Sequence, residues 1–153
     1  MIYIGVDPGK NGGIAYVING EIVEAVRMPE TEKGIREAFR KIKLLDGNCI
    51  AKLEQVHAFP GQGVSSMFKF GTNYGYLKAC MDCMDIDYDL VTPQKWQKSF
   101  INVMTDTKSE HKNNLKEAAK QYYPKGKVTL YTADAILLAV YCYLTKSKEG
   151  VIK

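Results

Sequence analysis

The sequence predicts an α/β fold built on a five-stranded mixed sheet flanked by helices. Three apolar, strand-like stretches open the chain, and Asn19-Gly20, the strongest short signal for a β-hairpin, joins the last two. Later strand-like runs alternate with stretches of helical periodicity. The first three strands should therefore pair antiparallel. Strands reached through helical crossovers should lie parallel to the first.

Each element has its own signal along the chain. Residues 2–6 are almost continuously apolar, as expected for a central strand. Residues 30–45 carry apolar side chains at helical spacing, with acidic residues early and basic residues late. The other predicted strands cover 13–18, 21–28, 48–56 and 86–91. The other predicted helices run from the Gly-rich stretch 59–63 to Met84, begin at Thr92-Pro93, and cover 108–122 and 132–144.

Composition predicts one globular domain over residues 1–153. The chain is 46% hydrophobic and 25% charged, and it is long enough to bury a core without disulfide or metal support. It has no apolar run of the roughly 20 residues that a membrane span needs, and Met1 leads directly into a strand. Four cysteines fit a reducing compartment, so we expect a cytoplasmic protein. Cys80 and Cys83 have CxxC spacing without partners for zinc, which favours free thiols on a helix.

Positive charge gathers in the C-terminal part of the chain. From Thr92 onward there are 11 lysines and 5 acidic residues, whereas the preceding residues carry 10 basic and 12 acidic side chains. This asymmetry favours a polyanionic partner such as nucleic acid. Lys112, Lys116 and Lys120 recur at a spacing of four on one predicted helical face. Phosphate contact and simple solvation of that face are both open.

Three carboxylates stand at the ends of predicted elements. Asp7 follows the first strand and precedes Pro8-Gly9, where it serves either the turn or a site at the strand's end. Glu54 lies in the fourth strand, which should neighbour the first, so the two carboxylates should converge. Asp134 is the one charge at the start of an apolar helix, and it either caps that helix with Thr132 or shares a cation with the other two. Carboxylate oxygens without histidine or thiolate favour Mg²⁺ or Mn²⁺.

These residues carry a resemblance to the RuvC-type Holliday junction resolvases, nucleases of the RNase H-like fold, and above all to their small phage versions. The resemblance implies that Asp7, Glu54 and Asp134 are the catalytic metal ligands, holding two Mg²⁺ ions for which Mn²⁺ can substitute. It places the family's lysines at Lys98 and Lys108, where they would hold phosphates or the charge that develops at the scissile group. The matching segments are Ile4-Gly5-Val6-Asp7-Pro8-Gly9, Leu53-Glu54-Gln55-Val56, Thr92-Pro93 and Ala133-Asp134-Ala135.

Two departures from the family pattern stand out. The family carries a fourth Asp or His ligand three residues before the last aspartate, where this chain has Tyr131. Either the second metal is held more loosely or another group, such as Glu117 or a backbone carbonyl, substitutes. The family also places an aromatic wedge where this chain has His57. The wedge expected to stack on opened bases is then His57 or Phe59, two residues further on.

The expected function is a dimeric, metal-dependent endonuclease that resolves Holliday junctions and other branched DNA by paired nicks. Lys98, Lys108, Lys112, Lys116, His57 and Phe59 are the expected DNA-binding residues. An aromatic-rich helix over 64–84 suggests a homodimer, because the family buries the corresponding helix in a two-fold interface. The alternative is a catalytically weak or inactive branched-DNA-binding protein of the same fold. An RNA substrate also stays open, and a phage origin would place the protein in the host cytoplasm.

Overall fold

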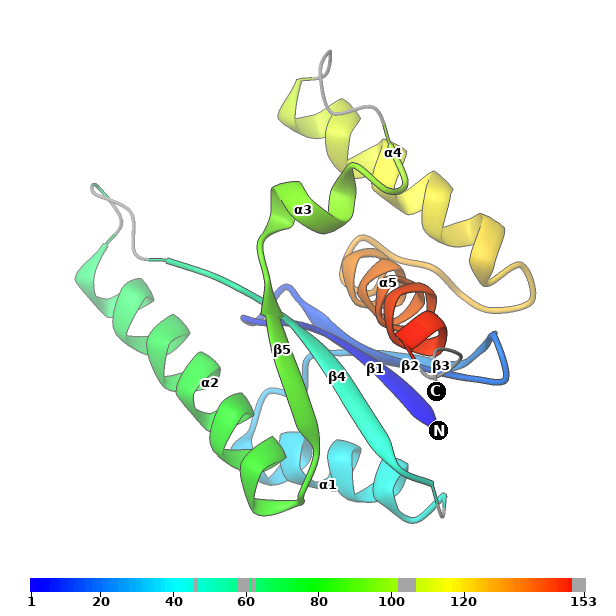
Figure 1. Ribbon diagram of the computed structural model, residues 1–153. Coiled ribbons are helices and arrows are strands. Elements are labelled where there is room, and N and C mark those ends of the chain that lie inside the picture. The colour runs from blue at the N-terminus through cyan, green and yellow to red at the C-terminus, as the bar shows by residue number, and fades with distance from the viewer. Residues whose placement is uncertain (46, 58–60, 62, 102–106, 150–153) are drawn as a thin grey trace.

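A single five-stranded sheet organises the computed structural model, which describes residues 1–45, 47–57, 61, 63–101 and 107–149 (Figure 1). The strand order is β3-β2-β1-β4-β5, which confirms the predicted mixed sheet. The strands are β1 (Ile2–Asp7), β2 (Gly13–Ile18), β3 (Glu21–Arg27), β4 (Cys49–Glu54) and β5 (Asp87–Val91). The helices are α1 (Glu32–Lys43), α2 (Val64–Cys83), α3 (Pro93–Gln97), α4 (Lys108–Tyr122) and α5 (Ala133–Glu149). Within the described residues, no helix is long and apolar enough to cross a membrane.

Strand pairing follows the predicted directions. β1, β2 and β3 pair antiparallel, and β1 pairs parallel with β4, which pairs parallel with β5. The β2–β3 turn places Asn19 and Gly20 at φ of 53° and 85°, the left-handed conformation that tight hairpins require. The parallel register puts the carboxyl ends of β1, β4 and β5 at one edge of the sheet. At that edge Asp7 pairs with Gly13, and Glu54 pairs with Val91.

Helices cover both faces of the sheet. In Figure 1, α1 and α2 lie on one side of it, and α5, with α3 and α4 beyond it, lies on the other. Two hydrophobic clusters match these layers, one including Ile4, Val6 and Phe39 and the other including Trp96, Leu115 and the central residues of α5. The apolar periodicity of 30–45 is thus explained, because α1 buries Ile35, Phe39 and Ile42.

Gly5 sets the distance between β1 and α5. A Cβ atom at this position would lie 2.2 Å from both the Ala135 carbonyl oxygen and the Ala139 nitrogen. The backbones of the central strand and the C-terminal helix therefore pack directly against each other. Side chains alternate along a strand, so Asp7, two residues after Gly5, is placed on the α5 face of the sheet.

Helix ends differ from the predicted ranges by a few residues for local reasons. Thr31 caps α1 by accepting a hydrogen bond from the Gly34 amide, so the helix begins after residue 30. Thr107 and Glu110 form a reciprocal capping box at the start of α4. The predicted end of α5 at 144 is wrong, because the helix continues to Glu149 in a polar last turn where Lys146 pairs with Asp89. The cysteines carry free thiols, as expected.

Candidate metal-dependent active site

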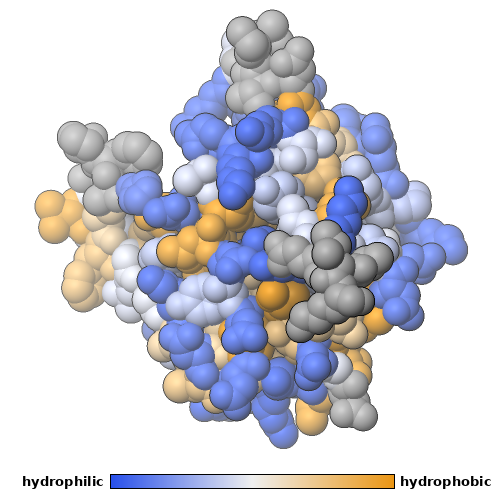
Figure 2. Space-filling model, in the orientation of Figure 1, coloured by the Kyte–Doolittle hydropathy of each residue, from blue (hydrophilic) through white to orange (hydrophobic). Residues whose placement is uncertain are grey.

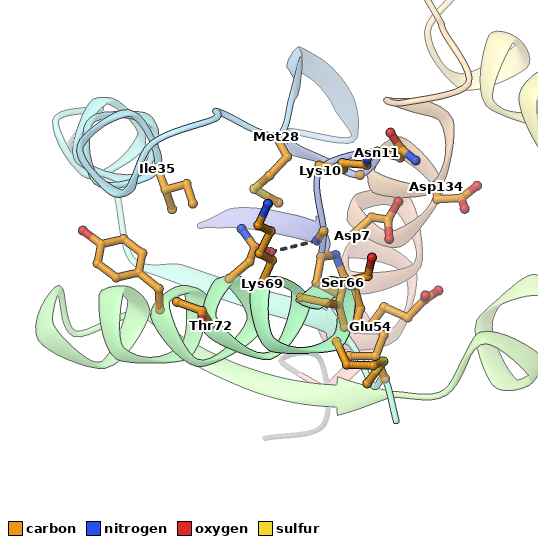
Figure 3. Close-up of a pocket in the computed structure, with 18 of the residues that line it drawn as sticks. Asp7, Lys10, Asn11, Met28, Ile35, Glu54, Ser66, Lys69, Thr72 and Asp134 are labelled. Atoms are coloured by element: carbon orange, nitrogen blue, oxygen red, sulfur yellow. Dashed lines mark hydrogen bonds between the residues drawn. The ribbon is translucent and has the colours of Figure 1, made fainter. Parts of the chain in front are cut away.

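The three predicted carboxylates lie in one pocket at the carboxyl edge of the sheet. Asp7 ends β1, Glu54 ends β4 and Asp134 lies in the first turn of α5, and all three line a cavity of about 1360 Å³. The turn after β1, the end of β3, the start of α1, the connection after β4, the N-terminal half of α2 and the start of α3 also line it. Figure 3 shows the three carboxylates at one end of the pocket, with Ile35 toward the other. The fold therefore brings together acids that are 47 and 80 residues apart in the chain.

Burial disfavours ionisation of all three groups, and repulsion from neighbouring carboxylates adds to this effect at Asp7 and Glu54. The pKa of Asp7 lies well above its ordinary value because burial removes water from the carboxylate, and Asp134 and then Glu54 raise it further. Burial likewise raises the pKa of Glu54 to about 7 and that of Asp134 to about 6. Lys112 opposes these effects, since its charge lowers the pKa of both Asp7 and Asp134. The pocket thus concentrates negative charge that nearby protein groups offset only in part.

Trp96 is a partner of Glu54 that sequence reasoning missed. Its indole Nε1–H donates a hydrogen bond of 2.8 Å to Oε2 of Glu54, and this donation lowers the pKa of Glu54 against the larger effect of burial. The side chain is 0% exposed, so Trp96 belongs to the core and cannot stack on DNA from this position. The available signal was physical: a buried indole N–H requires an acceptor, and Glu54 pairs with Val91 just before α3.

A second unpredicted contact ties α2 to the turn that follows Asp7. The Gly9 amide donates a hydrogen bond of 2.8 Å to Oδ1 of Asn73. Gly9 adopts a φ of 94°, and a Cβ atom there would lie 2.8 Å from the Phe70 ring. Helix α2 therefore fixes the Asp7–Gly9 turn by a side-chain acceptor and by close packing.

The lysines predicted to bind DNA differ in whether they line the pocket. In the part of the chain that the structure describes, the pocket lining includes Lys112 but not Lys98, Lys108 or Lys116. Lys108 begins α4 one helical turn before Lys112, and Lys98 follows the end of α3. Both are exposed. Lys10, Arg27 and Lys69 also line the pocket, and sequence reasoning had singled out none of them.

The structure describes one of the two candidate wedge residues, His57. His57 is exposed and lines the pocket beside the end of β4. Phe59 lies outside the described residues, so its placement stays a prediction. Both belong to the connection between β4 and α2.

Tyr131 is the residue at the fourth ligand position of the family pattern. At that position the Tyr131 ring packs against the guanidinium of Arg27. Glu117, the suggested substitute, forms an ion pair of 2.7 Å with Lys120 on the exposed side of α4 and is not among the described pocket residues. Asp134 lies in the first turn of α5, whereas the Thr132 hydroxyl bonds back to Thr129. These bonds tie the Thr132 hydroxyl to the turn before α5, and the capping of α5 by Asp134 with Thr132 stays a prediction.

The donor chemistry of the pocket fits a hard divalent cation, although its side chains do not form a complete coordination shell. Within the described part of the chain, no three His, Cys, Asp or Glu side chains are grouped closely enough to hold one ion. Mg²⁺ commonly binds through one or two carboxylates, with waters and substrate phosphates completing its octahedron. Three partly uncompensated carboxylates at one end of an open pocket suit that mode of binding.

Comparisons with solved structures define the fold class. The chain is similar to the RuvC of Thermus thermophilus in complex with a Holliday junction substrate, with 13% identity, a TM-score of 0.66, and coverage of 95% of this chain and 96% of that one. A second Thermus thermophilus RuvC structure gives 14% identity, a TM-score of 0.66 and coverage of 96% and 97%. No protein-family model matches the sequence, and no curated protein is similar to it in sequence.

A viral protein shares the same architecture. The fowlpox virus resolvase, solved with Holliday junction DNA, is 14% identical to this chain, with a TM-score of 0.51 and coverage of 92% and 98%. These likenesses establish a RuvC-like resolvase fold of the RNase H-like type. They extend over nearly the whole length of each chain compared.

Proposed function

We propose that this protein is a structure-selective, divalent-metal-dependent endonuclease that resolves Holliday junctions and other branched DNA by paired nicks. The observation that carries the proposal is the meeting of Asp7, Glu54 and Asp134 in one pocket, within a fold shared with resolvases solved on junction DNA. Neither the carboxylates nor the shared fold is sufficient alone, because one fold hosts many activities. Together they favour phosphodiester hydrolysis.

The proposed reaction is hydrolysis of one phosphodiester bond at each nick. A water oxygen forms a bond to phosphorus, and the bond from phosphorus to the leaving sugar oxygen breaks. One proton of the water ends on the leaving oxygen and the other is released, which leaves a hydroxyl and a phosphate monoester. Mg²⁺ or Mn²⁺, when bound in a pair, supplies activation of the water and stabilisation of the leaving oxygen.

The protein's own residues are proposed to hold the cations, orient their ligands and add positive charge beside them. Asp7, Glu54 and Asp134 are the proposed ligands of the cations. Trp96 orients one oxygen of Glu54 through its indole N–H and leaves the other oxygen available. Lys112 brings positive charge beside Asp7 and Asp134, where it can also contact a phosphate.

DNA contact is proposed for the basic residues along one side of the pocket and beyond it. Such contacts act on the phosphate backbone and weaken with salt. Lys112 lines the pocket with the three carboxylates, which supports a proposed contact near the scissile phosphate. The remaining proposed contacts are the lysines that lie outside the pocket and the two residues proposed as wedge: Lys98, Lys108, Lys116, His57 and Phe59. Lys108 keeps its proposed catalytic role through charge at the reacting phosphate.

A homodimer through α2 is part of the proposal. Apolar surface lies over the N-terminal end of this helix, where Val64 is 86% and Phe68 76% exposed (Figure 2). Gly71 and Gly75 follow on exposed positions, and a Cβ atom built at either would have no described neighbour within 4 Å. A two-fold pairing of α2 would cover this surface and match two cuts to a two-fold substrate. Gly75→Glu should convert the dimer to a monomer in light scattering, while Gly75→Ala should leave it dimeric.

A binding protein without cleavage is the second candidate. Two observations favour it: the described carboxylates do not form a ready cluster, and Tyr131 stands where the family pattern has a fourth ligand. One assay on a synthetic four-way junction distinguishes the two candidate functions. Nicks that appear only with Mg²⁺ or Mn²⁺ support the nuclease, and binding without nicks in either ion supports the alternative.

The site assignment is tested by Asp7→Asn. This variant is expected to abolish nicking while junction binding persists. Asp87→Asn is the matched control, because Asp87 is an exposed aspartate of β5 that is not among the described pocket residues. Cleavage by Asp7→Asn at the rate of the unchanged protein would refute the assignment. Three-way and linear DNA in the same gel would define the preferred branch.

A further inference from the structure

Arg27 is held in an unusual way at the rim of the pocket. Its guanidinium carbon lies 4.2 Å from the centroid of the Tyr131 ring. Its Nε and Nη2 atoms each lie 3.4 Å from the carbonyl oxygen of Lys10, to which they donate hydrogen bonds. The ring and the carbonyl together restrict the long side chain without neutralising its charge.

The other two arginines of the chain show the contrast. Arg36 and Arg40 both form ion pairs with Glu37 on α1. Among the residues that the structure describes, Arg27 forms no ion pair with a carboxylate. A guanidinium has five N–H donors, and two of them meet Lys10. Arg27 is exposed, so the remaining donors are available to a ligand in the pocket that both residues line.

The sheet places Arg27 at a defined distance from the carboxylates. Arg27 pairs with Gly13, and Gly13 pairs with Asp7, so the two residues are separated by two strand spacings at the same edge. Two spacings of about 4.8 Å amount to about 10 Å. A side chain as long as that of arginine can therefore reach a backbone phosphate close to one held at Asp7.

We propose that Arg27 binds a backbone phosphate flanking the scissile one, and that Tyr131 is the positioning residue that holds the guanidinium for it. This inference rests on the proposed nuclease function and adds a substrate contact to the same site. A planar guanidinium with unused donors recognises phosphate in a two-pronged manner that lysine cannot reproduce. Tyr131 thus has a role as an aromatic ring where the family pattern has a ligand.

A purely structural role is the competing explanation. In that case Arg27 serves only to hold the Lys10 carbonyl and the turn after β1. Replacing it would lower thermal stability but would leave the salt dependence of DNA binding unchanged. The salt dependence of DNA binding therefore distinguishes the two explanations, because a folding defect alone does not change it.

The experiment measures binding to a labelled four-way junction in EDTA across a salt series, with thermal unfolding of each variant in parallel. Arg27→Gln is expected to weaken binding and reduce the slope of log K against log salt by about 1. Arg40→Gln removes the same charge from α1 and should keep the original slope. Arg27→Lys should retain the slope with weaker binding, because it keeps the charge and loses the planar fork.

Tyr131 is tested by two substitutions that separate its ring from its hydroxyl. Tyr131→Phe keeps the ring and should bind as the unchanged protein does, whereas Tyr131→Leu should approach Arg27→Gln. In cleavage assays Arg27→Gln should raise the half-saturating DNA concentration while the rate at saturation stays within about twofold. An unchanged salt slope in Arg27→Gln, with normal binding by the parent, overturns this inference alone. Failure of the parent protein to bind any branched DNA overturns the proposed function as well.

Discussion

Replacing Glu54 by glutamine is expected to stabilise the metal-free protein at pH 8. Burial raises the pKa of this carboxyl to about 7, from an ordinary value of 4.5, so the fold favours the neutral form. A raised pKa contributes stability that is fully present below 4.5 and is lost as pH rises through 7. At pH 8 the folded protein must carry the ionised form. Glutamine removes that requirement and still offers Trp96 an amide oxygen as acceptor.

The size of the effect follows from the two pKa values. Their difference is about 2.5, and each pKa step corresponds to 1.36 kcal/mol, so ionised Glu54 costs the fold about 3 kcal/mol at pH 8. For a chain of this length that corresponds to a rise in Tm of roughly 6–12 °C for Glu54→Gln. The advantage should shrink toward pH 5, where the unfolded chain itself begins to take up the proton.

Thermal unfolding in EDTA, followed by circular dichroism at several pH values, measures this prediction. Asp89→Asn is the matched control, because it also removes one negative charge. The pKa of Asp89 is lowered, mainly by a hydrogen bond from Lys52 at 2.6 Å, so its ionised form stabilises the fold above the ordinary value of 3.8. Its replacement should therefore destabilise the protein at pH 8. Opposite signs for two similar substitutions exclude a general effect of net charge.

Added Mg²⁺ extends the same experiment to the proposed site. A cation that binds only the folded state stabilises it according to its concentration relative to Kd. The parent protein should gain stability with Mg²⁺ at pH 8, and Glu54→Gln should gain much less. If Glu54→Gln is no more stable than the parent in EDTA at pH 8, the electrostatic account of the pocket is refuted, whatever the outcome with Mg²⁺.

Three further predictions test other parts of the structure. Gly5→Ala should destabilise the fold by about 3 kcal/mol or more, because its Cβ would overlap the backbone of α5. Gly75→Ala, at a position of α2 with space for a Cβ, should instead stabilise the fold by up to about 1 kcal/mol. Chemical denaturation of both variants measures these changes. Under native conditions a thiol reagent should modify Cys83 alone, since the other three cysteines are buried, and mass spectrometry identifies the labelled residue. Trp96→Phe should weaken Mg²⁺ binding in calorimetry because Glu54 loses its orienting donor, and an unchanged affinity would contradict that role.

The sequence predicted the sheet and the meeting of Asp7 with Glu54 because both follow from strand order. Once the fourth strand lies parallel to the first, the ends of the two strands must share an edge. The observed register, with Val6 opposite Leu53, brings the last residues of β1 and β4 side by side. This part of the site required no knowledge of side-chain packing. It depended on hydrophobic periodicity and on the hairpin at Asn19-Gly20.

The contacts around the carboxylates could not be predicted in the same way. Lysines recur every four residues along α4, at Lys108, Lys112 and Lys116, and one turn of helix separates them by about 6 Å. Periodicity places them on one face but does not decide which turn lies over the pocket. The structure brings Lys112 there. The Trp96–Glu54 bond likewise depends on how α3 is rotated after β5, which five residues of sequence do not determine.

The packing that builds the core also holds the carboxylates against their own repulsion. Gly5 lets α5 approach β1 until the strand meets the helix backbone at Ala135, the residue after Asp134. Asp7 lies two residues beyond Gly5 on the same face, so the same contact fixes both acids near each other. Moving α5 away would relieve the charge but would uncover Ile136, Leu137 and the rest of an apolar helix. Relief then comes from protonation, as the raised pKa values of the three carboxyls indicate, or from bound positive charge, which under the proposed function would be a divalent cation.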